Sequence, residues 1–198
     1  MQKQTIYPDY NVMNSKDEWD VHTRQIVENR LVPVEDYSYF GWPEIETLRA
    51  VCSLLVDDSR TEIIAEVLRH FDSKMTEAKG EGQRKAGVPK EALLVRKGLQ
   101  ALDQSAMDRF QLPFHQLTEA GRRQLLTELA EGRLPAQGLW TAVPQKELFQ
   151  KLLMLTLESY YSHPAVWSEI GYGGPAYPRG YVRADIGHLD PWEAKQQP

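Results

Sequence analysis

ELFQKLLMLTLESYY, residues 147–161, is a segment whose apolar side chains surround a helix on nearly every side. A helix that is apolar around most of its circumference has to be covered by other elements. We therefore expect this segment to be the central helix of a bundle. It should end before Pro164, because proline disfavours a helical conformation in the residue that precedes it and lacks a backbone donor.

Other segments carry apolar residues at the spacing of an amphipathic helix. With the central helix, the expected helices cover about 19–31, 43–55, 59–71, 89–102, 118–131 and 144–161. The helix at 59 opens on SRTE, which has the form of a capping box. No segment shows the period of two that a strand would have. The sequence predicts an all-α fold, a bundle of about five to six helices.

We expect a single domain over residues 1–198. In this division residues 1–40 form an extended N-terminal arm, 41–163 the helical core, and 164–198 an irregular tail rich in Gly, Pro and Tyr. Residues 76–87 hold no apolar side chain larger than alanine, which predicts a mobile loop.

Composition excludes several classes of protein. A net charge of −5 gives no basic field for nucleic acid, and no apolar run is long enough to span a membrane. The single cysteine, Cys52, excludes an internal disulfide and any multi-cysteine metal site. The first twenty residues hold neither an apolar stretch nor paired arginines, so we expect a cytoplasmic protein.

No group of residues suggests catalysis. No two of the five histidines lie at metal-ligand spacing, although His163 could cap the end of the central helix as an imidazolium. Asp57 and Asp58 fit a turn between helices, and Cys52 fits a buried apolar face. The glycines of 171–181 match no phosphate-binding pattern. We expect no catalytic, cofactor-binding or metal site in this chain.

The tail, which contains GYGGPAYPRGY (171–181), is dense in aromatic residues with interleaved arginines. Tyr, Trp and Arg dominate the energetically important positions of protein interfaces. The expected partner-binding residues are Trp167, Tyr172, Tyr177, Arg179, Tyr181 and Arg183. The other interpretation is that these rings only cover the protein's own core.

ESYYSHPAVWSEIGYGGPAYPRGYVR (158–183) closely resembles the C-terminal end of the gluconate 2-dehydrogenase subunit 3 family. WPEIETLRAVCSLLVDD (42–58) is similar to the first core helix of that family, and 98–132 is similar to its helix–loop–helix. YPDYNV and DEWDVHTRQIVENRL are similar to the N-terminal arm of one branch. The resemblance covers nearly the whole chain.

The resemblance implies a small accessory subunit of a membrane-associated sugar or sugar-acid dehydrogenase. Its partner would be a large FAD-dependent subunit of the glucose–methanol–choline type, in many complexes with a cytochrome c subunit that carries haem c. The small subunit would assist maturation of the large one. Many relatives carry a twin-arginine leader that is not seen here. Residence in the periplasm or at the membrane would then follow from export with the partner.

Two alternatives come from other classes of protein. One is a self-contained enzyme with a site in the tail around His163, Glu169, Arg179 and Asp185. The other is a carbohydrate-binding module, because Trp and Tyr rings also stack on sugar rings.

Overall fold

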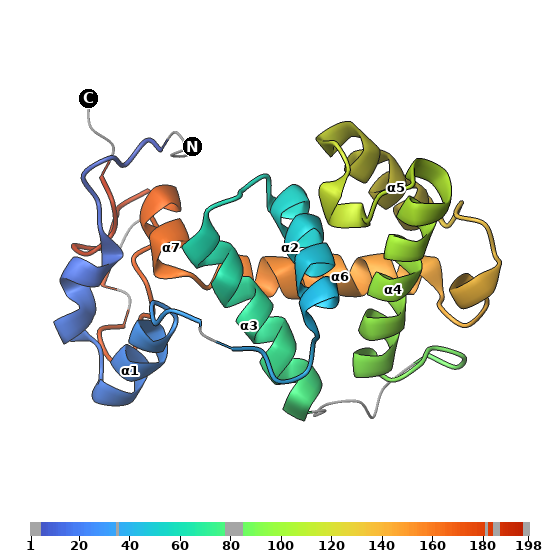
Figure 1. Cartoon of the computed structure of the whole chain (residues 1–198). Coiled ribbons are helices and arrows are strands. Elements are labelled where there is room, and N and C mark those ends of the chain that lie inside the picture. Colours follow the sequence, from blue (N-terminus) through green and yellow to red (C-terminus); the bar gives the residue numbers. More distant parts are fainter. Residues whose placement is uncertain (1–4, 35, 78–84, 181, 184–186, 196–198) are drawn as a thin grey trace. The chain divides into compact units, whose positions relative to one another are not determined.

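The computed structural model describes residues 5–34, 36–77, 85–180, 182–183 and 187–195, and the regular elements in these ranges are all helical (Figure 1). The predicted all-α class is confirmed. The chain divides into two compact units. We call Val34–Glu158 the core unit, and Met1–Pro33 together with Ser159–Pro198 the arm–tail unit. The expected single domain, with its arm, core and tail, stays a prediction.

The core unit contains the five helices that the sequence predicts beyond residue 40. They are α2 (Trp42–Val56), α3 (Thr61–Glu77), α4 (Glu91–Phe110), α5 (Glu119–Glu131) and α6 (Gln145–Tyr160), of which the last two residues belong to the arm–tail unit. Two short 3-10 helices, η2 (Phe114–Gln116) and η3 (Gly138–Thr141), follow α4 and α5 and were not predicted. Most of the expected mobile loop, residues 78–84, lies outside the described residues.

Helix α6 runs behind α2, α3 and α4 in Figure 1. Its Glu158 pairs with Lys74 of α3 at 3.4 Å. The Cys52 thiol of α2 lies 3.3 Å from the Thr156 hydroxyl, with both groups buried. Gly98 of α4 lies against Leu148 so closely that a methyl group would not fit between them. These contacts confirm that α6 is the central helix of the core unit.

Asp72 anchors the segment that enters the core unit. Its carboxylate, on α3, accepts the backbone N–H groups of Ser38, Tyr39 and Phe40 at 2.7–3.0 Å. Asp72 is 6% exposed, so these amides replace its lost water. The Arg96 guanidinium also contacts this segment and lies 3.8 Å from the centre of the Tyr39 ring. The entry segment is therefore fixed by polar contacts as well as by packing.

The expected capping box of α3 is wrong. The helix begins at Thr61, so Ser59 lies one residue before the N-cap position. The nearby carboxylate of Asp58 instead accepts the backbone N–H of Arg60 at 3.0 Å and pairs with its guanidinium at 2.6 Å. Asp57 ends α2 with a left-handed φ of 50°. The turn interpretation of the two aspartates is confirmed.

The arm–tail unit contains η1 (Val12–Glu18), α1 (Val21–Asn29) and α7 (Pro164–Ile170). Helix α1 matches the helix expected over 19–31, and Asp20 caps it by accepting the N–H groups of His22 and Thr23. Helix α7 corrects the expectation that the tail is irregular from residue 164. Proline is well suited to the first turn of a helix, and Gly171 then ends α7 with a φ of 73°.

Candidate functional site

The N-terminal arm and the tail pack together around one aromatic cluster. Trp167 of α7 is 6% exposed and packs with Val12, Trp19 and Val27 from the arm. Its indole N–H donates to the carbonyl of Tyr161 at 2.5 Å. This ring therefore belongs to the interior of the arm–tail unit.

Arg179 braces the glycine- and proline-rich loop of the tail. Its side chain is only 5% exposed, and it donates to the carbonyls of Gly173 and Pro175 at 2.7 and 3.0 Å. The same guanidinium pairs with Glu18 of η1 at 3.1 Å and lies 4.5 Å from the centre of the Trp192 ring. A buried arginine needs such acceptors, and here they close the loop and tie it to the arm.

Three glycines of this loop are in close contact with aromatic rings. A Cβ atom on Gly171 would lie 2.5 Å from the Tyr7 ring, one on Gly173 2.8 Å from Trp192, and one on Gly174 2.6 Å from Trp19. Real Cβ atoms do not approach other atoms this closely. Packing therefore explains Gly171, Gly173 and Gly174, and these glycines give no sign of a phosphate-binding loop.

Replacing Gly174 by alanine should destabilise the arm–tail unit by about 2–4 kcal/mol, because it combines overpacking with a strained backbone. Gly180→Ala is the matched control: Gly180 has a similar φ, 73° against 78°, but no atom lies within 4 Å of its added Cβ. The control should lose only about 1 kcal/mol. Urea unfolding of both variants measures the difference, and equal losses would contradict the packing argument.

The six expected partner-binding residues fall into different environments. Trp167 and Arg179 are buried by the contacts described above. Tyr172 and Tyr177 are 43% and 70% exposed, and Arg183 is also exposed. Tyr181 lies outside the described residues. Partner binding by this set stays a prediction, and only the exposed members could contact a partner without rearrangement.

His163 caps a different helix from the one expected. Its Nδ1 accepts the backbone N–H of Ala165 at 3.2 Å, so the side chain caps the start of α7 rather than the end of α6. An accepting Nδ1 carries no proton, which excludes the expected imidazolium in this conformation. Arg179 binds the carbonyls of Gly173 and Pro175, and Asp185 lies outside the described residues, so an enzyme site in the tail stays a prediction.

The single cysteine, Cys52, is buried in the core unit. Burial raises the pKa of the Cys52 thiol to about 12, so it stays protonated and unreactive at neutral pH. No cluster of three or more His, Cys, Asp or Glu side chains that could hold a metal occurs among the described residues.

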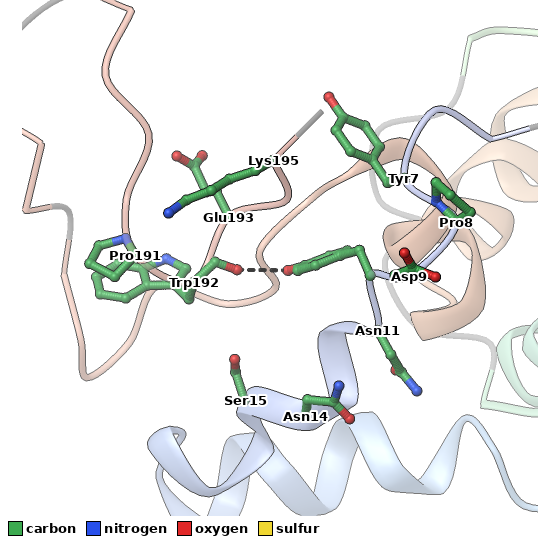
Figure 2. Close-up of a pocket in the computed structure, with 11 residues that line it drawn as sticks. Tyr7, Pro8, Asp9, Asn11, Asn14, Ser15, Pro191, Trp192, Glu193 and Lys195 are labelled. Carbon is green, nitrogen blue, oxygen red and sulfur yellow. Dashed lines mark hydrogen bonds between the residues drawn. The ribbon is translucent and has the colours of Figure 1, made fainter. Parts of the chain in front are cut away.

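A pocket of about 380 Å³ lies between the arm and the C-terminal turn of the arm–tail unit (Figure 2). We call it the arm pocket. Its wall is formed by Tyr7, Pro8, Asp9, Tyr10, Asn11, Asn14, Ser15, Pro191, Trp192, Glu193 and Lys195. The hydroxyl of Tyr10 donates to the carbonyl of Trp192 at 2.8 Å and so joins the two sides (Figure 2). Burial raises the pKa of the Tyr10 phenol, which keeps it a donor.

Sequence reasoning missed the arm pocket and the residue that shapes its C-terminal side. Asp190 is 1% exposed and accepts the N–H groups of Val182 and Arg183 at 2.8 and 2.7 Å. Asp190 thus fixes the turn that carries Trp192 and Glu193. No periodicity marks these residues, because they lie in irregular chain and Trp192 meets Tyr10 of the arm from 182 positions away.

No helix in the described ranges is both long and apolar enough to cross a membrane. A family model described as gluconate 2-dehydrogenase subunit 3 matches residues 43–174. The match runs from the start of α2, through α7, to the glycine that contacts Trp19. Neither a curated protein nor a solved structure gave a match to the chain.

Proposed function

Because the chain belongs to the gluconate 2-dehydrogenase subunit 3 family, we propose that it is the non-catalytic small subunit of a membrane-associated flavoprotein dehydrogenase. The substrate is gluconate or a related sugar or sugar acid. In this proposal a large subunit of the glucose–methanol–choline type binds FAD, and a cytochrome c subunit with haem c takes up the electrons. This chain supports the assembly, maturation or stability of the large subunit, and the complex acts in the periplasm or at the membrane once exported.

The observation that carries the proposal is the family match over residues 43–174. It is supported by the roles of the reactive side chains that the structure describes. His163 caps a helix, Arg179 binds backbone carbonyls, and Cys52 is buried with a raised pKa. Side chains that are used in this way for structure are not available for catalysis. A subunit that acts through its surface does not need them for chemistry, whereas a self-contained enzyme needs reactive side chains that are available to a substrate.

The exposed tail residues are the best candidates for contact with the large subunit. The Tyr172 ring is positioned by an edge-to-face contact with the buried Trp167 ring, and the two ring centres lie 5.4 Å apart. Tyr177 lies in the loop that Arg179 closes through Gly173 and Pro175. Rings held by a rigid loop lose little conformational entropy when they bind a partner.

Purification of the tagged chain from its native host tests the proposal directly. We expect a co-purifying chain that mass spectrometry identifies as an FAD-binding oxidoreductase, together with flavin absorbance in proportion to it. A purified chain without any flavoprotein, obtained from cells with active dehydrogenase, would contradict the proposal. Turnover of a sugar or sugar acid by the isolated chain would favour the self-contained enzyme instead.

Tyr177→Ala should weaken the complex with the large subunit about thirtyfold, which corresponds to roughly 2 kcal/mol for an interface anchor. The melting temperature of the isolated chain should not change, because the ring is 70% exposed. Leu189 provides the control: this residue is 51% exposed, and it lies in the same unit but outside the loop that Arg179 closes. Leu189→Ala should leave both quantities unchanged, and a Tyr177 variant that assembles normally would exclude this ring as an anchor.

A further inference from the structure

The arm pocket has no part in the proposed function, and its lining has a distinct chemistry. We infer that it binds a single neutral sugar ring, stacked on its aromatic side chains and hydrogen-bonded by its amide, hydroxyl and carboxylate groups. At about 380 Å³ the pocket lies at the small end of the range for ligand sites. That volume suits one ring rather than an oligosaccharide or a dinucleotide.

The aromatic residues of the wall are held in place by contacts within the arm–tail unit. The Arg179 guanidinium lies 4.5 Å from the centre of the Trp192 ring. Arg179 itself does not line the pocket. The Tyr7 ring lies against Gly171, and the Tyr10 hydroxyl is bonded to the Trp192 carbonyl. Rings that are already fixed lose little entropy when an apolar sugar face stacks on them.

The polar part of the wall offers both donors and acceptors. Asn11, Asn14 and Ser15 lie on or next to η1, and Figure 2 shows Asn14 and Ser15 on the η1 side of the Tyr10–Trp192 bond. An amide both donates and accepts, as each hydroxyl of a sugar does. Neutral groups of this kind satisfy a polyhydroxylated ligand, whereas a cation enclosed by aromatic rings would not need them.

The charges around the pocket disfavour other ligand classes. The lining holds two carboxylates, those of Asp9 and Glu193, and one ammonium, that of Lys195, so a phosphate group would meet a net negative wall. Glu193 is fixed by accepting the Asp190 N–H at 2.7 Å. A quaternary ammonium ion would be attracted by the carboxylates and the rings but repelled by Lys195. The hydroxyl groups of a neutral sugar can donate hydrogen bonds to the two carboxylates and accept one from the ammonium, so all three charged groups can contact the ligand.

Nitrogen-15 correlation spectra of the full chain test the inference with D-glucose, D-galactose and D-mannose as probes. The indole N–H signal of Trp192, assigned by its loss in Trp192→Phe, should shift with at least one sugar. We expect a Kd of about 1 mM, ordinary for a ligand of this size. Choline is the comparison probe and should leave the signal unmoved.

Asn14→Trp should fill the arm pocket and weaken sugar binding by at least about tenfold, a change that titration resolves. Asn14 is exposed, so the fold should tolerate the larger side chain. Gln25→Trp places the same ring on an exposed residue of α1 that does not line the pocket, and it should bind sugar as the parent does. An Asn14→Trp chain with unchanged affinity would overturn the inference.

Failure of all three sugars to shift the Trp192 signal at about 50 mM would also overturn it, as would a shift with choline alone. None of these results depends on the large subunit. The sugar-binding experiment and the co-purification experiment can therefore fail independently of each other.

Discussion

Asp72→Ala should lower the free energy of unfolding of the core unit by about 3–5 kcal/mol. The substitution removes the acceptor of three backbone N–H groups, those of Ser38, Tyr39 and Phe40. Asp72 itself is 6% exposed. Each hydrogen bond to a charged group contributes about 1.5–3 kcal/mol, although neighbouring bonds do not add in full. The amides left behind are partly shielded from water, which adds to the loss.

Asp103→Ala provides the graded comparison within the same unit. Asp103 accepts a single backbone N–H, that of Phe114 at 2.8 Å, and its loss should cost about 1–2 kcal/mol. Asp72→Asn keeps one carbonyl oxygen as acceptor and should fall between the two alanine variants. Urea unfolding gives the three values, and hydrogen exchange at residues 38–40 locates the effect. Similar losses for Asp72→Ala and Asp103→Ala would show that the three amides find other acceptors.

The helices of the core unit were predictable because each buries one face. In α3, Ile64, Val67, Leu68 and Phe71 recur at helical spacing, and all of them are buried. Asp72 lies beside this stripe, and its partners belong to a segment more than thirty positions away. Periodicity reports which side of a helix is covered, but it does not report what covers it. The one sign of this role in the sequence was an aspartate at the edge of an apolar stripe. Only the burial of Asp72 in the structure shows that its carboxylate needs hydrogen-bond partners.

The arm–tail unit was predicted less well for a physical reason. Helix α7 is seven residues long, too short for periodicity to identify, and its start depends on a histidine that acts as an N-cap. The glycines of 171–174 were recognised as a rigid and unusual loop. These positions require glycine because the rings of Tyr7, Trp19 and Trp192 pack against them, and these rings come from both ends of the chain. Contacts of this range leave no local pattern, so the sequence could not decide between a binding surface and a packed interior, and part of the segment is packed interior.

Trp167→Ala should destabilise the arm–tail unit by about 3–5 kcal/mol, the usual loss for a buried large aromatic side chain. The ring is 6% exposed and fills the cluster with Val12, Trp19 and Val27. Its loss also removes the bond from the indole N–H to the Tyr161 carbonyl and the ring beneath the Arg30 guanidinium, which lies 5.5 Å from its centre. Hydrogen exchange should accelerate in η1 and α1, which pack against it.

Trp42→Ala is the matched control because it removes the same side chain from a position that is 72% exposed. Its effect on unfolding should stay within about 0.5 kcal/mol, as for most surface substitutions. If Trp167→Ala instead keeps full protection in η1 and α1 but loses the large subunit, Trp167 is a docking residue and not a packing residue. If it loses protection and the large subunit together, the arm–tail unit must be folded before it can bind. Tyr177→Ala, which leaves the cluster intact, then measures the contact itself.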